Sequence, residues 1–391
     1  MDPNRNPFNP GAGVMPPELA GRYDALEGAI LTLNRIRRGR YERSFVYTGL
    51  RGVGKTVLLR EIRNKARAMG YQANMLEARD GQRLADLLIP AIRSALLEID
   101  RASRTVEAVK RSLRVLRSFM GSIEIDAGAI SVSLDVDPEP GKADSGNLEQ
   151  DIADLLLSVG EAAKAAGKPV SILIDEMQYL AKEDLASLFR GIHAVNQEEL
   201  PLVFFGAGLP QLAGQSGEAK SYAERLFEFI PLDHLSEEDT YAAIRGPVES
   251  ELATITDEAL AEVFTHTRGY PYFLQEWGYN AWNLADFDGI TLDAARRATA
   301  RSIAKLDGSF FRVRFDRLTP SEREYMRHLA DLGEGPQRTS DVAARAQKTV
   351  RSLGTIRDSL IKKGMIFSPE HGLVAFTVPL FDAFMHRVMP G

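Results

Sequence analysis

The chain has 391 residues, of which 44% are hydrophobic and 26% charged, and a net charge of −6. This length allows two or three domains, each with a core of its own. No run of about 20 apolar residues could span a bilayer, and the first residues lack the basic and apolar regions of a secretory signal. The absence of cysteine excludes disulfides and thiolate chemistry, and the six histidines lack metal-ligand spacing. We therefore expect a cytoplasmic protein with no membrane role.

The net charge argues against a chain that coats nucleic acid over its whole surface. From Ser309 to the C-terminus, however, there are 13 Lys and Arg against 9 Asp and Glu, a net of +4, which leaves −10 for the rest. Such an asymmetry indicates a separate basic region at the C-terminal end.

The first predicted elements are an N-terminal arm, a helix and a strand. Residues 1–20 are rich in Pro, Asn and Gly and should run extended over the surface. Helical spacing of Leu26, Ile30, Leu33 and Ile36 predicts a helix. The β-branched and aromatic run 44–48 predicts a buried strand, which is followed by a glycine-rich loop and a helix that Gly70 closes.

Residues 101–149 are predicted to be an insertion. It begins with a basic amphipathic helix, for which packing on neighbouring helices is favoured over a nucleic-acid or membrane role. Period-two alternation over 122–137, around Ala127-Gly128, then predicts a hairpin.

Alternating strands and helices continue after the insertion. A helix over 148–166 precedes the apolar strand 171–175, and another helix precedes the strand 202–205. This alternation predicts a parallel α/β sheet. From Ser236 the strand signals stop, which predicts a small helical domain. Three further helices and a hairpin within 365–378 then give the pattern of a winged helix.

The segment GLRGVGKT at 49–56 matches the phosphate-binding pattern G-x-x-x-x-G-K-[ST], with a strand before it and a helix after it. Its glycines let backbone N–H groups surround phosphates, and the helix adds the positive end of its dipole. Lys55 should reach the β- and γ-phosphates, and the Thr56 hydroxyl should bind Mg²⁺. The predicted nucleotide-binding residues here are Gly49, Leu50, Arg51, Gly52, Val53, Gly54, Lys55, Thr56 and Val57.

A second motif, Ile172-Leu173-Ile174-Asp175-Glu176, places two carboxylates at the end of an apolar strand. Asp175 is the predicted second Mg²⁺ residue, and Glu176 should polarise a water for attack on the γ-phosphate. Such an acidic pair can also simply cap a strand-to-helix turn. Downstream of a phosphate loop in an α/β pattern, the catalytic interpretation is favoured.

With these motifs, PELAGR before the first strand and the helical tail, the chain resembles AAA+ ATPases. It is most similar to the initiator (origin-recognition-like) and STAND-type group, and to a bacterial family of ATP-binding proteins. The resemblance implies a P-loop NTPase α/β domain at 21–235, a helical lid at 236–308 and a winged helix at 309–391. It also implies ATP and Mg²⁺ as cofactors, and self-association.

Further site residues follow only from this resemblance. Leu19, Gly21 and Arg22 match the box that lines the adenine, and Pro271 belongs to the G-x-P turn of STAND lids. Arg225 matches an arginine finger that would reach a neighbour's γ-phosphate, although it could equally be a surface arginine. The lid lacks the arginine that initiators place there, and the strand before Gln211 lacks the usual polar sensor.

Three functions remain open at this point. The chain could be an ATPase switch that acts on double-stranded DNA, a STAND-like signalling ATPase that binds a partner protein, or a slow-turnover nucleotide-binding scaffold. The predicted recognition helix has basic residues at its ends but also core positions, so DNA and protein remain alternatives. Its basic residues are Lys348, Arg351, Arg357, Lys362 and Lys363. Trp277 and Trp282 are expected in the core rather than as a base-stacking platform.

Overall fold

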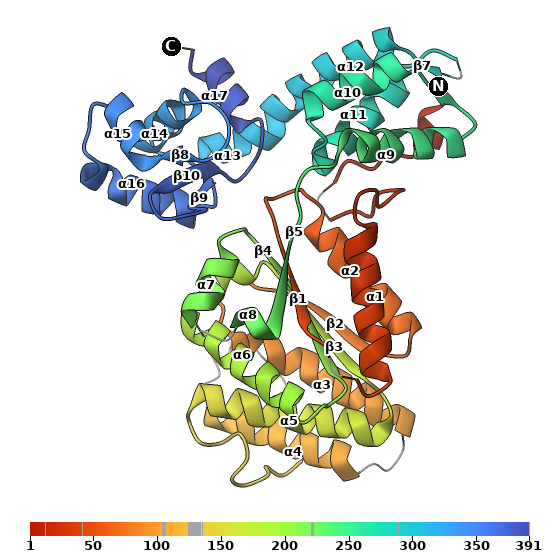
Figure 1. Cartoon of the computed structure of the whole chain (residues 1–391), viewed down its shortest axis with the longest axis vertical. Coiled ribbons are helices and arrows are strands. Elements are labelled where there is room, and N and C mark those ends of the chain that lie inside the picture. Colours follow the sequence, from red (N-terminus) through yellow and green to blue (C-terminus); the bar gives the residue numbers. More distant parts are fainter. Residues whose placement is uncertain are drawn as a thin grey trace. The chain divides into compact units, whose positions relative to one another are not determined.

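A computed structural model describes residues 1–11, 13–40, 42–103, 107–123, 134, 136–219, 223–287 and 289–390. The chain forms two compact units (Figure 1). We call Arg22–Gly49 with Lys55–Leu232 the sheet unit, and Met1–Gly21, Leu50–Gly54 and Asp233–Gly391 the helical unit. The hairpin predicted around Ala127-Gly128 lies outside the described residues.

The sheet unit is built on five parallel strands in the order β2-β3-β4-β1-β5. Apolar runs predicted three of these strands, and the alternation with helices predicted their parallel arrangement. Because parallel strands are covered on both faces, such runs are almost continuously hydrophobic. The strands are β1 (Ser44–Thr48), β2 (Gln72–Glu77), β3 (Val170–Asp175), β4 (Leu202–Gly208) and β5 (Phe227–Pro231).

Helices cover both faces of this sheet (Figure 1). The helices α1 and α2 pack on one face, and α3, α5 and α6 pack on the other, with α4 against α3 and α5. The bounds are α1 (Tyr23–Arg37), α2 (Lys55–Ala68), α3 (Leu84–Ser103), α4 (Glu107–Ser122), α5 (Leu148–Ala166) and α6 (Lys182–Gln197). Three short helices complete the unit: η2 (Met177–Tyr179), α7 (Leu212–Ala219) and α8 (Ala223–Leu226).

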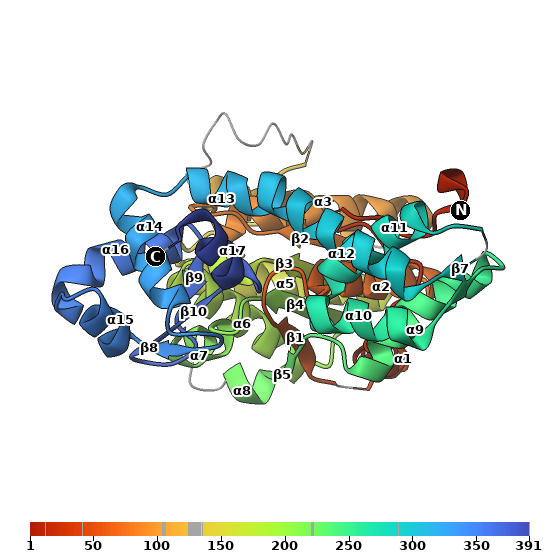
Figure 2. The ribbon, with the colours of Figure 1, turned by 90° about the horizontal axis from the view of Figure 1, so that it is seen from above.

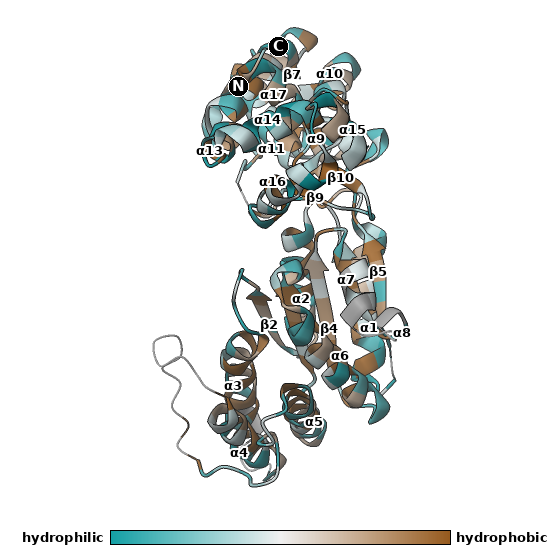
Figure 3. Ribbon diagram, turned by 90° about the vertical axis from the view of Figure 1, so that its left-hand side faces the viewer, coloured by the Kyte–Doolittle hydropathy of each residue, from teal (hydrophilic) through white to brown (hydrophobic). Residues whose placement is uncertain are grey.

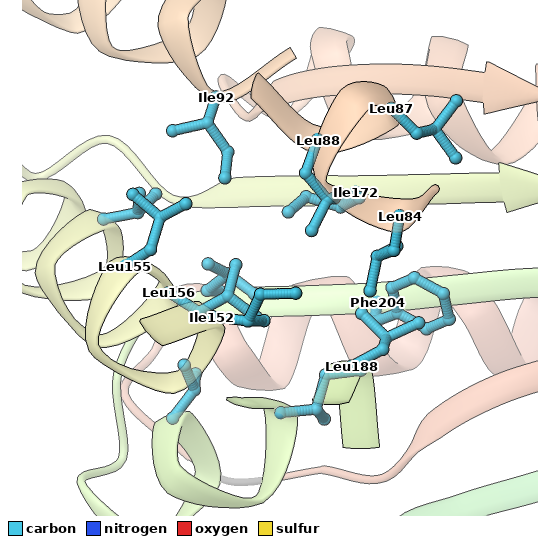
Figure 4. Close-up of a cluster of buried hydrophobic side chains, with 14 of the residues drawn as sticks. Leu84, Leu87, Leu88, Ile92, Ile152, Leu155, Leu156, Ile172, Leu188 and Phe204 are labelled. Atoms are coloured by element: carbon cyan, nitrogen blue, oxygen red, sulfur yellow. The ribbon is translucent and has the colours of Figure 1, made fainter. Parts of the chain in front are cut away.

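The core on the second face follows the period-two alternation of the strands. Ile172 of β3 and Phe204 of β4 point toward Leu88 of α3 and Leu156 of α5 (Figure 4). Apolar residues of α4 join the same cluster, which agrees with the prediction that this basic helix packs on its neighbours. Figure 3 shows hydrophobic residues along the strands and on helix faces turned toward one another.

The helical unit begins with four helices, as the sequence predicted. They are α9 (Glu237–Ser250), α10 (Asp257–Thr267), α11 (Pro271–Leu284) and α12 (Leu292–Lys305). The prediction that no strands follow Ser236 is wrong in one detail, because β6 (Thr254–Ile255) pairs in parallel with β7 (Gly289–Ile290). Two residues are too few to give a period-two signal. Trp277 and Trp282 are buried, as expected.

A π-helical segment, η3 (Leu306–Phe311), leads from α12 into α13 (Arg312–Asp316), a path visible in Figures 1 and 2. The remaining order of helices and strands is consistent with a winged helix, including the predicted hairpin β9–β10. The elements are α14 (Pro320–Ala330), β8 (Gln337–Arg338), α15 (Thr339–Arg345), α16 (Val350–Lys362), β9 (Ile366–Phe367), β10 (Leu373–Phe376) and α17 (Phe381–Val388).

The N-terminal arm does not simply run over the surface, so that prediction is wrong. It contains a short helix, η1 (Pro3–Arg5), and Phe8 is only 1% exposed. The Asn6 side chain donates to the Tyr279 carbonyl, and the Trp282 indole donates to the Asp2 carbonyl. Polar composition hid a single aromatic anchor that buries the arm against α11. Among the described residues, no helix is long and apolar enough to cross a membrane.

Candidate nucleotide-binding site

The two ends of the phosphate loop belong to the sheet unit. The Gly49 N–H donates to the Gly208 carbonyl at 3.1 Å, which continues the pairing of β1 with β4 into the loop. Lys55 begins α2 and is only 5% exposed. Its Nζ donates to the Gly49 carbonyl at 2.7 Å, so the ammonium is held inside the loop. A buried ammonium at this place is suited to bind phosphate.

Thr56 and Asp175 lie together, as the two predicted Mg²⁺ residues should. The Thr56 hydroxyl donates to Oδ2 of Asp175 at 2.5 Å, and the Glu176 N–H donates to Oδ1 at 2.9 Å. Asp175 is 3% exposed, and burial raises the pKa of its carboxyl while the Thr56 hydroxyl and Lys55 act in the opposite sense. This carboxylate is costly to bury and would gain from a cation.

Glu176 is held in an unusual backbone conformation, with φ at +55°. The turn begins η2 and brings Gln178 back against it. The Gln178 side chain donates to the Glu176 carboxylate through Nε2 and accepts from the Leu209 N–H through Oε1, at 3.0 Å in the second case. Gln178 therefore connects the predicted catalytic carboxylate to the segment that follows β4. Non-glycine residues in this conformation are strained and occur often at functional sites.

Gln178 was not predicted from the sequence, because nothing in its spacing marks it. The signal lies in the turn geometry. The predicted sensor substitute, Gln211, has a buried side-chain oxygen with no hydrogen-bond partner in the described part of the chain. Arg225 is exposed at the end of α8.

The tip of the loop, Leu50–Gly54, belongs to the helical unit. Gly52 and Gly54 have φ of +89° and +95°, which other residues rarely adopt. The Gly52 carbonyl accepts from the Tyr272 N–H at 3.2 Å. Arg51 donates through its N–H to the Thr377 carbonyl and through its guanidinium to the Gly364 carbonyl at 2.9 Å. Val53 is buried.

The predicted lid turn at Gly269-Tyr270-Pro271 packs in the same unit. Gly269 has φ of +69°, and a Cβ there would stand 2.1 Å from the Leu235 carbonyl oxygen, so only glycine fits. Pro271 occupies the first turn of α11, where its missing N–H costs no hydrogen bond. Tyr270 precedes it and is buried.

The remaining predicted nucleotide residues are divided between the two units. Leu19 is half-buried in the helical unit, whereas Arg22 and Val57 are buried in the sheet unit. Arg22 precedes the first residue of α1.

The residues present fit a nucleotide with Mg²⁺. The loop offers backbone N–H groups around positive-φ glycines, a buried ammonium, and a hydroxyl paired with a buried carboxylate. No group of three or more His, Cys, Asp and Glu suited to a metal occurs among the described residues. Mg²⁺ binds proteins through one or two side chains and completes its shell with phosphate and water, so Thr56 and Asp175 suffice.

Family comparisons agree with this geometry. Residues 18–205 match the family of the AAA ATPase domain, and residues 308–385 match a domain of unknown function (DUF8462). The sequence matches no curated protein significantly.

Solved structures resemble the chain over almost its whole length. The Walker-type ATPase PABY2304 of Pyrococcus abyssi is 13% identical with a TM-score of 0.59, covering 97% of this chain and 99% of that chain. A Thermotoga maritima RuvB (14% identical, 96% and 97% covered) and Cdc6p of Pyrobaculum aerophilum (13%, 99% and 98%) have TM-scores of 0.47 and 0.46. Scores below 0.5 carry no argument, so the first relative alone supports the fold. The predicted fold class is confirmed: a P-loop NTPase with a parallel sheet and a mostly helical C-terminal region.

Replacing Asp175 with asparagine should stabilise the nucleotide-free protein at neutral pH. Because the folded-state pKa is raised, the unfolded chain loses its proton first as pH rises, and ionisation above about pH 4 then costs stability. Asp175→Asn removes this cost. Its thermal unfolding midpoint should exceed that of the wild type at pH 7, with a gap that shrinks as the pH falls.

The control is Asp80→Asn, which removes an exposed charge and should leave the midpoint unchanged. The same titration with ATP should reveal weaker Mg²⁺ dependence in Asp175→Asn only. A lower midpoint at pH 7 would show that the carboxylate stabilises the fold.

Proposed function

We propose that this chain is an ATPase that binds ATP with Mg²⁺ and hydrolyses it as a conformational switch. The observation that carries the proposal is the hydrogen bond from Thr56 to the buried Asp175, next to Lys55 inside the loop. Burying a carboxylate and an ammonium this deeply costs free energy that a Mg²⁺–phosphate ligand would offset. The match of residues 18–205 to an AAA ATPase domain supports the same activity.

Each side chain then has one task. Lys55 binds the β- and γ-phosphates, and Thr56 and Asp175 hold Mg²⁺, the latter directly or through water. Mg²⁺, when bound, neutralises charge that develops on the phosphate oxygens. Glu176 orients the attacking water and accepts its proton, while Gln178 fixes the position of the Glu176 carboxylate. The remaining loop residues bind phosphate through their N–H groups.

Residues outside the loop would complete the site in an assembly. Leu19, Arg22 and Pro271 would line the adenine. Arg225 is exposed and could serve a neighbouring copy as an arginine finger, which makes self-association part of the proposal. Since α11 contributes no arginine, the hydrolysis rate should depend mainly on Glu176 and this neighbour.

The surface of α16 supports DNA as the target of the switch. Of the five predicted basic residues, Lys363 donates to Glu322 and Arg357 pairs with Asp358, so these two are engaged within the domain. Lys348, Arg351 and Lys362 are exposed, and no carboxylate in the described part of the chain pairs with them. Three such cations at the two ends of one helix suit contacts with DNA phosphates.

A partner protein is the alternative target, as in STAND-type ATPases. Val350 is 44% exposed at the start of α16, and the loop between β9 and β10 carries Glu370 and His371 rather than a basic cluster. Apolar exposure beside scattered charges suits a protein surface.

Glu176→Gln should bind ATP normally but lose hydrolysis. The amide keeps the size of the side chain and its hydrogen bond with Gln178 but cannot accept a proton, so turnover should fall by about 10²- to 10⁴-fold. Phosphate release under single-turnover conditions, with binding measured by calorimetry, tests this. Glu183→Gln, an exposed acid on α6, is the matched control. Equal turnover in Glu176→Gln and wild type would remove Glu176 from the mechanism.

DNA binding should depend steeply on salt and on the three exposed cations of α16, Lys348, Arg351 and Lys362. The triple variant Lys348→Ala/Arg351→Ala/Lys362→Ala should bind a duplex more weakly. Its slope of log affinity against log salt should be smaller by roughly 0.9 for each DNA phosphate that the variant no longer neutralises. Fluorescence anisotropy with and without ATP measures both quantities.

A charge-matched control replaces three exposed cations of the sheet unit, Lys110, Arg117 and Lys164, with alanine. Its salt slope should equal that of the wild type. If the wild-type chain binds no duplex at low salt, the protein-partner alternative replaces DNA.

A further inference from the structure

Arg314 of α13 is a half-buried arginine in the helical unit. Its guanidinium carbon lies 3.9 Å from the centroid of the Phe310 ring, and one of its N–H groups donates to the Phe310 carbonyl at 2.8 Å. These contacts fix the position of the guanidinium but leave most of its five donors for another group.

The surroundings of Arg314 in the described part of the chain lack a counter-charge. Burial lowers the pKa of its guanidinium, and the next largest effect is the positive charge of Arg51 in the phosphate loop. No carboxylate among the described residues pairs with Arg314, whereas its neighbour on the same helix, Arg312, pairs with Asp316 at 3.0 Å. Two cations in partly desolvated surroundings cost free energy unless an anion joins them.

Aromatic side chains connect Arg314 to the loop tip. Phe310, beneath the guanidinium, stacks on Tyr272 with ring centroids 4.8 Å apart. The Tyr272 N–H donates to the Gly52 carbonyl, and a Cβ on Gly52 would stand 3.1 Å from the Tyr272 Cβ. Arg314 is thus two side chains away from the loop that gathers phosphate.

Tyr270 provides a second, independent observation at the same place. It is 4% exposed, yet its hydroxyl has no hydrogen-bond partner among the residues that the structure describes. A Cβ on Gly52 would stand 3.0 Å from its ring and 3.5 Å from its hydroxyl oxygen. A buried hydroxyl without a partner costs free energy, and buried tyrosine hydroxyls usually find one. This donor is beside the loop tip.

We propose that Arg314 and the Tyr270 hydroxyl bind the phosphate chain of the nucleotide at the tip of the loop. The inference rests on the proposed ATP site and adds residues from the helical unit to it. The guanidinium can donate two parallel hydrogen bonds to phosphate oxygens, and the phenol can donate a third. The lid lacks the arginine of initiators, and here the same charge comes from the segment after the lid. The nucleotide would then stabilise the packing of the helical unit on the loop tip.

Removing the charge of Arg314 tests the inference in the full-length chain. Arg314→Gln should weaken the binding of Mg·ATP, measured by isothermal titration calorimetry, by about tenfold or more, since a charge-assisted hydrogen bond is lost. Arg314→Lys should restore part of the affinity. Tyr270→Phe should weaken binding severalfold without lowering the unfolding midpoint of the nucleotide-free protein, because it removes a hydroxyl that has no partner in the described structure.

Arg323→Gln is the matched control. Arg323 is also half-buried and lies over an aromatic ring, Phe315, with its guanidinium carbon 4.3 Å from the centroid. If Arg314 only packs on Phe310, both glutamine variants should lose stability and neither should lose ATP affinity. If the inference holds, Arg314→Gln alone should lose affinity, and inorganic tripolyphosphate should compete with ATP less well in that variant.

The outcomes separate this inference from the proposed function. Wild-type protein that binds ATP, together with unchanged affinity in both Arg314→Gln and Tyr270→Phe, would overturn the inference and leave the ATP site intact. Wild-type protein that binds no ATP would overturn both.

Discussion

The hydrogen bond between the Thr56 hydroxyl and the buried carboxylate of Asp175 determines the geometry of the candidate site. It joins the first turn of α2 to the end of β3, two segments more than a hundred residues apart. The contact is possible because β1 and β3 lie on either side of β4 in a parallel sheet, so both end at the same edge. Ligands of α/β sheets bind at this carboxyl edge. The helices on both faces of the sheet keep this edge in place and dry enough for the carboxylate to be desolvated.

Several groups at the site are in costly states that a ligand would relieve. Asp175 is a carboxylate in an apolar setting, Glu176 has a strained backbone, and Gln211 has a buried oxygen with no partner among the described residues. In the described part of the helical unit, the Tyr270 hydroxyl lacks an acceptor and Arg314 lacks a carboxylate. A fold that needed only stability would replace such groups with apolar ones. Their presence supports a ligand that is both anionic and bound to a cation.

The sequence predicted the features that depend on local pattern. The phosphate loop, Asp175 and Glu176 are recognisable because backbone curvature requires glycine and because the carboxylates follow an apolar strand. The parallel sheet and the helical C-terminal region follow from periodicity. Gln178, Tyr272 and Arg314 were not predicted, because each is defined by where a turn or a π-helical segment directs it, and no spacing rule reports that. Phe8 was missed for a related reason: one buried aromatic residue does not change the polar composition of an arm.

The central claim is that the buried ammonium in the loop binds nucleotide phosphate. Calorimetric titration of Mg·ATP into wild-type protein and Lys55→Ala tests it most directly, with Lys65→Ala, an exposed lysine on the same helix, as control. We expect saturable binding by the wild type and by Lys65→Ala, and none by Lys55→Ala at the same concentrations. Equal affinity in all three proteins would contradict the assignment of the site.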